Sequence, residues 1–371
     1  MQPLLKWAGG KEKELKYILP AMPEFRRYFE PFVGGGAVYA AVDAAEYYIN
    51  DLSTELINFY RYLAGEEGSE IFFRYVDNIN TAWNGARELF TRHRELLRLY
   101  TGFRDELLTK DMLDMEVSYF CRDFRDEILG LTGDRFNDDP DAFIREIRRT
   151  FIDKMSRMKK LELTKSRLSE KDLSDNIETA VKGALYMYFR HLYNDNIIEV
   201  LDPAKHCALF LFIRNYCYSG MFRYNSDGKF NVPYGGIAYN GKNFDKKMEY
   251  YKSSGLSAKL AATHICNLDF EKFLIEHKPD EDDFIFLDPP YDSEFSTYAN
   301  NEFTRDDQKR LADYLTGKCV AKWMMVIKHT DYIYGLYDRP GINILTFDKS
   351  YLVSFMNRND RKVKHLLITN Y

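Results

Sequence analysis

The sequence has little of several features that define other classes of protein. Its five cysteines follow no pattern, which argues against a disulfide scaffold and against zinc-ligand spacing. The longest uninterrupted apolar run, residues 207–213, falls far short of the roughly 20 residues that span a bilayer. The first residues lack the apolar core and cleavage site of a secretory signal. We therefore expect a cytoplasmic protein with no membrane partner.

Aromatic residues, by contrast, are abundant. The 28 Tyr and 27 Phe help to bring the aromatic content to 16%, more than a core requires, so we expect some rings to face a ligand. The length of 371 residues favours one large domain with a substantial insertion. The net charge of −5 argues against a chain that grips nucleic acid over its whole surface.

One stretch departs from this average charge. Residues 145–167 carry nine basic side chains against three acidic ones. Such a stretch is either a surface that faces phosphate or an ordinary solvated helix face, and the charge alone does not choose between them.

Hydrophobic periodicity distinguishes two kinds of segment in the chain. Short apolar, β-rich runs occur at both ends, at 28–32, 47–49, 264–270, 284–287, 322–328, 343–347 and 364–369. Between them, residues 59–200 are charged and helical in pattern. The alternation of strands and helices predicts an α/β fold with a parallel sheet. We predict a discontinuous catalytic domain, 1–58 and 201–371, interrupted by a helical insertion, 59–200.

A glycine-rich turn follows the first predicted strand. Gly34, Gly35 and Gly36 stand between an apolar run and a helical pattern, where glycines allow a sharp turn and a close approach to a ligand, although a turn without a ligand has the same pattern. Asp51 ends the next predicted strand, near the spacing of about 20 residues at which an acid reaches ribose hydroxyls. Alternatively, Asp51 caps a helix that begins at Leu52.

The most specific motif is Asp288-Pro289-Pro290-Tyr291, directly after the apolar run 284–287. Four apolar residues predict a buried strand, and two prolines then end its pairing and stiffen the loop at its carboxyl edge, where ligands bind in open α/β sheets. A carboxylate, a proline carbonyl and a tyrosine ring held in such a loop can accept hydrogen bonds from an amino group and stack on its heteroaromatic ring. A plain turn is the alternative, which the preceding strand disfavours.

With this motif the sequence resembles the Dam-like (D12 class), DPPY-type methyltransferases, which methylate adenine N6 in DNA with S-adenosylmethionine. Further stretches fit the family's order, at 6–11, 29–38, 50–51, 303–315 and 367–371. The resemblance implies a Rossmann-like, mostly parallel methyltransferase sheet, with the helical insertion as a target-recognition domain.

The resemblance also implies residue roles. Trp7, Lys11, Phe32, Gly34, Gly36, Asp51, Asp269, Phe270 and Asp288 would bind S-adenosylmethionine. Asp288, Pro289, Pro290 and Tyr291 would form the catalytic loop. Asp288 and the Pro289 carbonyl would accept hydrogen bonds from the amino group of a flipped-out adenine, on which Tyr291 would stack. No metal is implied.

Residues 216–236 resemble the hairpin that these enzymes insert into DNA. The turn chemistry at 225–228, between aromatic-rich arms, independently predicts a hairpin. The expected DNA-binding residues are Tyr218, Ser219, Met221, Arg223, Asn225 and Pro233. Arg223 can make a bidentate contact with a guanine edge, and Tyr218 can wedge or stack where a base has left the duplex. The alternative is an edge hairpin whose aromatic rings cover the core.

We therefore predict a site-specific DNA adenine methyltransferase with a GATC-like target. The helical stretch is longer than compact members need, so the GATC site does not transfer with the motifs. Duplex DNA is the expected partner, a cognate restriction endonuclease a functional one, and the nucleoid of a bacterial or phage-infected cell the expected place. The alternatives are an amino-methyltransferase acting on cytosine or RNA, and a catalytically silent DNA-binding protein. A dehydrogenase is disfavoured because the glycine spacing is not GxGxxG.

Three remaining patterns have structural interpretations. Thr304 and Asp307 predict a capping box that opens a helix, with Gly317 as the glycine after its end. The acidic run 280–283 predicts a solvated loop. The seven histidines show no ligand spacing, so we expect no metal site.

Overall fold

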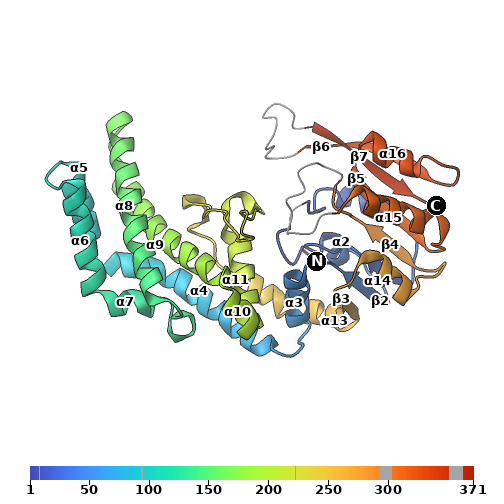
Figure 1. Ribbon diagram of the computed structural model, residues 1–371, viewed down its shortest axis with the longest axis horizontal. Coiled ribbons are helices and arrows are strands. Elements are labelled where there is room, and N and C mark those ends of the chain that lie inside the picture. The colour runs from blue at the N-terminus through green and yellow to red at the C-terminus, as the bar shows by residue number, and fades with distance from the viewer. Residues whose placement is uncertain (8, 93–94, 222, 292–302, 351–361) are drawn as a thin grey trace. The chain divides into compact units, whose positions relative to one another are not determined.

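The computed structural model describes residues 1–371 except 8, 93–94, 222, 292–302 and 351–361 (Figure 1). The chain divides into two compact units. The sheet unit comprises Met1–Ala64, Phe222–Tyr224 and Ser253–Tyr371, and the helical unit comprises Gly65–Met221 and Asn225–Lys252. Each is described by itself. None of the helices in the described part of the chain is both long and apolar enough to cross a membrane.

A seven-stranded sheet organises the sheet unit, in the order β3-β2-β1-β4-β5-β7-β6. Its strands are β1 (Arg27–Glu30), β2 (Glu46–Asn50), β3 (Thr263–Cys266), β4 (Phe284–Leu287), β5 (Lys322–Lys328), β6 (Asn343–Ser350) and β7 (Lys362–Thr369). The first five pair in parallel, and β7 is antiparallel to both β5 and β6. The predicted mostly parallel α/β fold is confirmed.

Helices of the sheet unit follow its strands in the chain. They are α1 (Leu15–Ile18), α2 (Ala37–Ala41), α3 (Thr54–Leu63), α13 (Ser254–Ala261), α14 (Phe270–His277), α15 (Arg305–Gly317) and α16 (Asp331–Tyr337). Leu274, Leu311 and Ile333, from α14, α15 and α16, pack with strand residues in one buried apolar cluster. All four residues of β4 are buried, as expected for a central parallel strand covered on both faces. The loop after β4 therefore starts from a rigid base.

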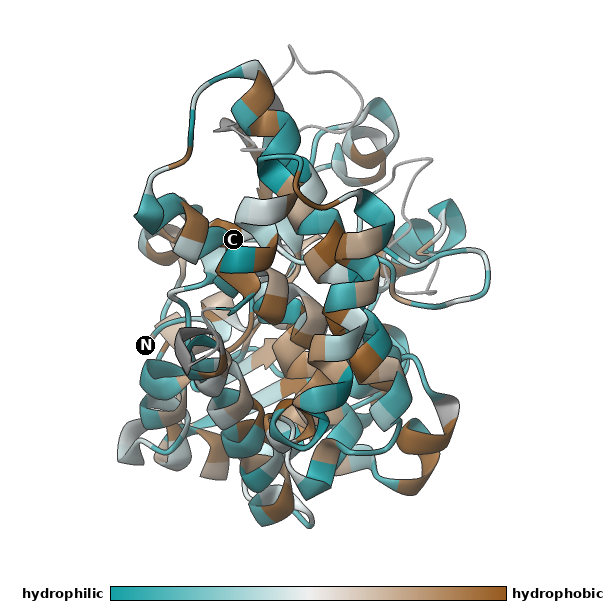
Figure 2. Cartoon of the chain, turned by 90° about the vertical axis from the view of Figure 1, so that its left-hand side faces the viewer, coloured by the Kyte–Doolittle hydropathy of each residue, from teal (hydrophilic) through white to brown (hydrophobic). Residues whose placement is uncertain are grey.

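The helical unit consists of helices, most of which carry both hydrophilic and hydrophobic residues (Figure 2). They are α4 (Ser69–Arg92), α5 (Glu95–Arg104), α6 (Lys110–Asp123), α7 (Arg125–Gly130), α8 (Pro140–Thr164), α9 (Glu170–Tyr193), α10 (Asn196–Leu201), α11 (Pro203–Tyr216) and α12 (Asp245–Tyr251). The long helices α4, α9 and α11 pack on one another, and α8 packs on α9. Helix α11 is buried from Ala204 to Tyr216.

This packing corrects the predicted domain boundaries. Residues 201–221 and 225–252 belong by their contacts to the helical unit, not to the catalytic unit, because α11 packs on α4 and α9. Residues 59–64 belong to the sheet unit. The helical unit therefore begins at Gly65, six residues after the predicted start of the insertion, and extends past its predicted end at residue 200 to Lys252.

Two local predictions need correction. The capping box between Thr304 and Asp307 is present. Gly317, however, is the last residue of α15 and not the glycine after its end, because Lys318 is the C-cap. The acidic run 280–283 is not a fully solvated loop, because the Asp283 side chain is buried and accepts hydrogen bonds of 3.0 and 3.1 Å from Arg27 Nε. Burial would raise the pKa of Asp283, yet the hydrogen bonds from Arg27 hold it below its ordinary value.

Candidate active site

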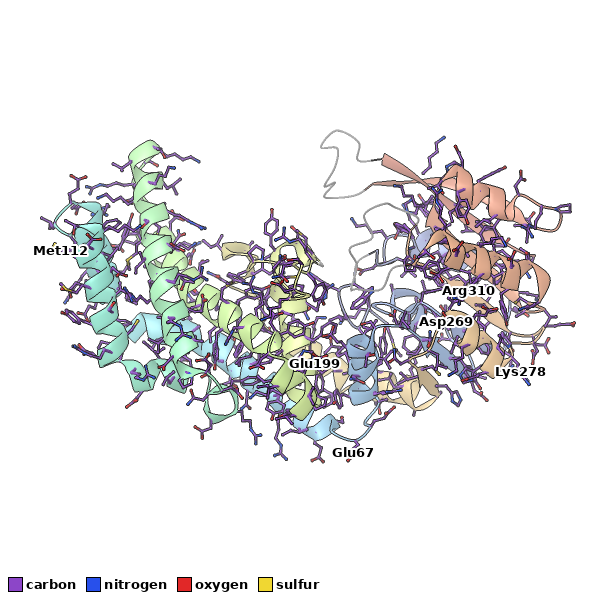
Figure 3. The ribbon with its side chains drawn as sticks, in the orientation of Figure 1. Glu67, Met112, Glu199, Asp269, Lys278 and Arg310 are labelled. Carbon is purple, nitrogen blue, oxygen red and sulfur yellow. The ribbon has the colours of Figure 1, made fainter. Side chains whose placement is uncertain are left out.

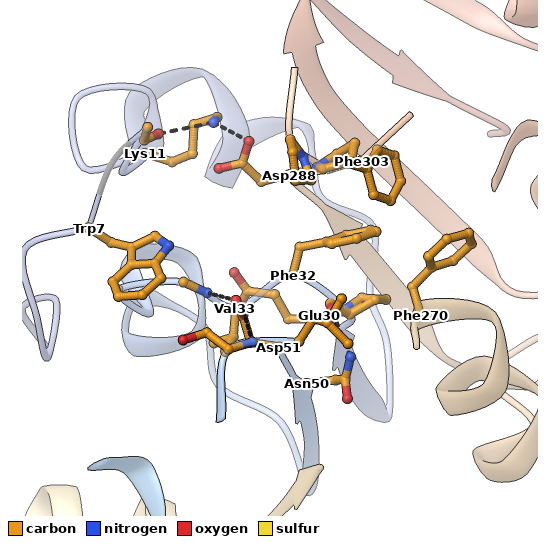
Figure 4. A pocket seen from close by; sticks show the side chains of 18 of the residues that line it. Trp7, Lys11, Glu30, Phe32, Val33, Asn50, Asp51, Phe270, Asp288 and Phe303 are labelled. Atoms are coloured by element: carbon orange, nitrogen blue, oxygen red, sulfur yellow. Dashed lines mark hydrogen bonds and ion pairs between the residues drawn. The ribbon is translucent and has the colours of Figure 1, made fainter. Parts of the chain in front are cut away.

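A cavity of about 310 Å³ lies at the carboxyl ends of the parallel strands (Figure 4). Among the residues that line it are Trp7, Lys11, Phe32, Gly34, Asp51, Asp269, Phe270, Asp288, Pro289, Pro290 and Tyr291. Gly36 does not line the cavity and instead stands at the N-cap of α2. The sheet topology thus brings the other expected cofactor residues and the whole proline loop to one place.

The glycine turn after β1 leaves no room for side chains. Gly34 adopts φ +49°, and a Cβ there would lie 2.7 Å from Cδ1 of Trp7. A Cβ on Gly35 would overlap the carbonyl oxygen of Leu5, and the Gly35 carbonyl accepts a 3.0 Å hydrogen bond from the Leu4 amide. The N-terminal segment therefore packs directly on the turn and forms one wall of the cavity.

Asp51 fixes this turn to the end of β2. Its carboxylate accepts hydrogen bonds from the amides of Gly34, at 3.1 Å, and Ser53, at 3.0 Å. Burial raises the pKa of Asp51 to about 6, against the lowering effect of the backbone hydrogen bonds. Helix α3 is capped by the Ser53 side chain, so the alternative in which Asp51 is the N-cap is wrong. Its carboxylate is left facing the cavity.

Asn50, which the sequence analysis did not single out, fastens two of the cavity's loops. Its buried amide donates to the carbonyls of Pro31, at 3.0 Å, and Leu268, at 2.9 Å, and accepts from the Leu268 amide at 2.8 Å. The loops after β1 and β3 are therefore held together across β2.

Aromatic rings form the opposite wall. The Phe32, Phe270 and Phe303 centroids lie 5.5 to 5.6 Å apart, pair by pair. Next to them, Asp269 caps α14, and both of its carboxylate oxygens accept hydrogen bonds from Nη2 of Arg310 in α15, at 2.8 and 2.9 Å (Figure 3). The Asp269 carboxylate is therefore engaged within the protein, and its position beside the rings is fixed by two helices.

The Asp288 side chain is paired with a buried cation. Lys11 is 2% exposed, and its Nζ contacts Asp288 Oδ1 and lies 3.1 Å from the Gly9 carbonyl and 3.3 Å from the Tyr291 hydroxyl. Three donors on one ammonium thus meet three acceptors. The structure places Lys11 at the proline loop as well as on the cavity wall, although the sequence suggested only a cofactor contact.

Helix α15 holds the proline loop from the other side. The fully buried Gln308 donates from Nε2 to the Pro290 carbonyl at 2.8 Å. Proline has no backbone N–H, so a loop with two prolines depends on its carbonyls and side chains for anchoring. This bond therefore fixes the loop directly after Asp288 and Pro289.

Glu30 is a buried carboxyl group in the cavity wall. Burial raises its pKa well above the ordinary value, although the 2.8 Å hydrogen bond from the Tyr28 hydroxyl opposes this rise.

The predicted hairpin is present with short arms, and its residues belong to the helical unit except 222–224, which belong to the sheet unit. Tyr218 and Pro233 pair through a 2.8 Å backbone hydrogen bond, and the amide of Asn225 donates to the Lys229 carbonyl at 2.9 Å to close the turn. Ser219, at φ +54°, interrupts the first arm. Tyr218 is 53% exposed, whereas Phe230 of the return arm is buried. The hairpin therefore both covers the core and presents polar and aromatic side chains.

A row of side chains on α9 supports the return arm. Tyr186 and Arg190 donate to the Val232 carbonyl at 2.9 and 3.1 Å. Asn194 exchanges hydrogen bonds of 3.0 and 2.9 Å with the backbone of Phe230. These side chains are four residues apart, so they lie along one helix face and fix the arm at successive points.

Part of the basic stretch 145–167 is engaged in contacts within the helical unit. Arg148 pairs with Asp114, Arg149 with Glu146, Arg145 with Asp139, and Arg167 with Asp105, while Lys159 donates to the Phe103 carbonyl. These contacts favour the helix-face interpretation over a surface dedicated to phosphate.

Comparison with known proteins decides the family. A model of the D12 class N6 adenine-specific DNA methyltransferases matches residues 7–352. The chain belongs to this family. The predicted resemblance to this family is confirmed.

Individual relatives of this D12 class chain differ in length. It is 35% identical over 178 residues to the type II methyltransferase M.CviBI of Paramecium bursaria Chlorella virus NC1A, covering 46% of this chain and 63% of that protein. It is 26% identical to the DNA N-6-adenine-methyltransferase of Escherichia phage P1, covering 84% and 28%. It is 25% identical to the DNA adenine methylase of Vibrio cholerae serotype O1, covering 98% and 94%. The chain thus spans less than two thirds of the first two and nearly all of the third.

Several site residues of this D12 class chain lacked a recognisable signal in the sequence. Asn50, Gln308 and His365 are common residue types at unremarkable positions, and their roles depend on which elements are neighbours. Phe303 stood in a matched stretch, and its place in an aromatic-rich chain was the available clue. Among the described residues, no cluster of three or more potential metal ligands occurs.

Proposed function

We propose that this chain transfers a methyl group from S-adenosylmethionine to the N6 amino group of an adenine flipped out of duplex DNA. The main support is a single cavity lined by the glycine turn, Asp51 and the Asp288 loop. The D12 class requires a methyl donor, and S-adenosylmethionine as that donor is part of the proposal.

The chemistry of the cavity fits this donor. When bound, S-adenosylmethionine supplies an electrophilic methyl group on a sulfonium. The Asp51 carboxylate at the end of β2 is suited to ribose hydroxyls, and the Phe32, Phe270 and Phe303 rings offer an apolar surface for an adenine. Gly34 and Gly35 would let the donor approach the backbone.

The proline loop acts on the target base. Its amino nitrogen is a weak nucleophile because its lone pair is delocalised into the ring. Hydrogen bonds to Asp288 and the Pro289 carbonyl would localise that pair and stabilise positive charge as it develops on nitrogen. The contact with Lys11 orients Asp288, and the Tyr291 ring would stack on the base. In this arrangement the loop needs to orient the nitrogen for attack on the methyl rather than to form a covalent intermediate.

The hairpin accounts for the DNA part of the proposal. Extruding a base costs a few kcal/mol of stacking and pairing. Tyr218 is exposed at the hairpin base and can occupy the vacated stack, while the exposed Arg223 can read a guanine edge. These assignments support a GATC-like target in which one guanine is read directly.

The test is methyl transfer with identification of the product. The purified chain is incubated with labelled S-adenosylmethionine and duplex DNA, single-stranded RNA or DNA lacking adenine, and the products are digested to nucleosides. We expect N6-methyl-2′-deoxyadenosine from adenine-containing duplex DNA alone, and sequencing of the modified bases would give the site. Label in cytosine or in RNA would establish the alternative substrate, and absence of both binding and transfer would leave a silent scaffold.

A role in restriction and modification is a further part of the proposal. It is supported by the chlorella virus relative, whose name describes a type II methyltransferase. DNA from cells that express the chain should resist an endonuclease that cuts at the mapped site. Cleavage as fast as that of DNA from cells without the chain would contradict protection.

A further inference from the structure

A buried histidine touches the catalytic tyrosine. His365 lies on β7, which is paired on one side with β5 and on the other with β6. Its side chain is fully buried, its Nε2 lies 3.2 Å from the Tyr291 hydroxyl, and the two ring centroids are 5.6 Å apart at 73°. The edge-on ring of His365 thus meets the tyrosine at its hydroxyl end.

Lys11 meets the same hydroxyl. Its Nζ is 3.3 Å from that oxygen and 5.4 Å from the ring centroid. An ammonium can only donate, so the tyrosine oxygen accepts from Lys11, and its own proton can point to Nε2 of His365. The hydroxyl is therefore held by an N-terminal residue and by a strand near the C-terminus.

We propose that His365 is a positioning residue that sets the ring plane of Tyr291 for stacking on the target base, an inference that rests on the proposed function. A tyrosine side chain turns about two torsions, and only one ring orientation is parallel to a bound base. The Asp288-Lys11 contact fixes the loop at its start, and His365 fixes it at the far end of the tyrosine ring. A β-strand with hydrogen-bonded neighbours on both sides is a rigid support for such a contact.

A double-mutant cycle tests this proposal. His365→Asn is too short to keep the contact at Nε2, and Tyr291→Phe removes the hydroxyl. We expect each variant to slow single-turnover methyl transfer about tenfold, as for the loss of one positioning hydrogen bond, and the double variant to be no slower than either. Multiplying losses would overturn the proposal, because His365 would then act independently of the hydroxyl.

Two further variants separate positioning from folding. His365→Gln carries an amide that reaches the Nε2 position, so we expect it to recover most of the rate. His264→Asn makes the same replacement on β3, the edge strand at the end of the sheet far from β7, and should leave the rate unchanged. Cofactor affinity, measured by calorimetry, should be equal in all of these proteins.

The proposal remains testable if the His365 variants do not fold. Tyr291→Phe alone must then show the tenfold loss, and a wild-type rate would overturn the proposal. Failure of the proposed function itself would look different, because the wild-type chain would then transfer no methyl group to DNA adenine.

Discussion

The two units expose functional residues in different ways. In the sheet unit, short motifs separated by hundreds of residues converge on one cavity, and several of its charged groups, including Lys11 and Asp288, are paired within it. In the helical unit, five of the nine basic side chains in the stretch 145–167 form ion pairs with acidic side chains of the same unit. Sequence motifs at strand ends are therefore a better guide to function in this protein than charge density on a helix.

This contrast predicts where substitutions act. Changes in the cavity should affect chemistry or cofactor binding on every DNA sequence, whereas changes in the hairpin should affect the choice among sequences. Four experiments sharpen or break that separation.

The largest effect should come from Asp288→Asn. The amide still offers an oxygen to Lys11, so the fold should be kept, but the negative charge that stabilises the reacting nitrogen is lost. We expect the rate to fall about 100- to 1,000-fold, with cofactor affinity little changed. Asp282→Asn, in a loop of the same unit, is the matched control, and a near-wild-type rate for Asp288→Asn would refute its catalytic assignment.

Gly35→Ala should weaken cofactor binding. The added Cβ would overlap the Leu5 carbonyl and displace the N-terminal segment from the turn. Overpacking of this kind costs about 1–3 kcal/mol, so we expect the dissociation constant measured by calorimetry to rise roughly 10- to 100-fold. Gly317→Ala meets no atom within 4 Å and should bind normally. Equal affinities for both variants would remove the turn from the site.

Arg223→Ala should change sequence preference. Loss of a bidentate contact with guanine costs about 1–3 kcal/mol of discrimination, so the ratio of rates on cognate and singly altered sites should fall about tenfold. Lys229→Ala, in the same hairpin, should weaken binding to all sequences alike if it meets only phosphate. If Arg223→Ala behaves like Lys229→Ala, the arginine contacts the backbone and not a base.

The smallest effect concerns pH and Asp51. Because burial raises its pKa to about 6, the carboxylate becomes protonated as the pH falls through that value, and cofactor affinity should decrease severalfold. The free energy of unfolding should change in the opposite direction. The stability that the raised pKa of Asp51 contributes to the folded state is present below the ordinary pKa of 3.8 and is lost as the pH rises through about 6.

Asp51→Asn should flatten both curves. Calorimetric titration and thermal unfolding on either side of pH 6 check the two signs separately. A variant that keeps the wild-type pH dependence of binding would assign that dependence to another group.

Local sequence was sufficient to predict the strands, the glycine turn and the proline loop. A four-residue apolar run before Asp288, or three glycines after a strand, constrains the backbone without reference to the rest of the chain. The pairings inside the site could not be predicted in this way. Lys11 meets a partner 277 residues away and Tyr291 one 74 residues away, so these contacts depend on the final strand order.

The same reasoning explains two wrong predictions. Asp283 was assigned to a solvated loop because acidic runs usually face solvent. Its side chain is instead buried, and it accepts a hydrogen bond from Arg27, the first residue of β1. The domain boundary at residue 200 followed a change in composition, whereas α11 is apolar because it is the core of the helical unit. Composition distinguishes buried from exposed segments, but it does not say which core a buried segment joins.

Two side chains of helix α15 hold different parts of the cavity wall in place. Gln308 donates a hydrogen bond to the loop that would bind the nucleobase. Arg310, two positions later, donates to Asp269 on the side expected to bind the methyl donor. Inserting one residue near the start of this helix would turn both side chains by about 100° and release both anchors together. A single insertion in this helix would therefore disturb both sides of the cavity at once.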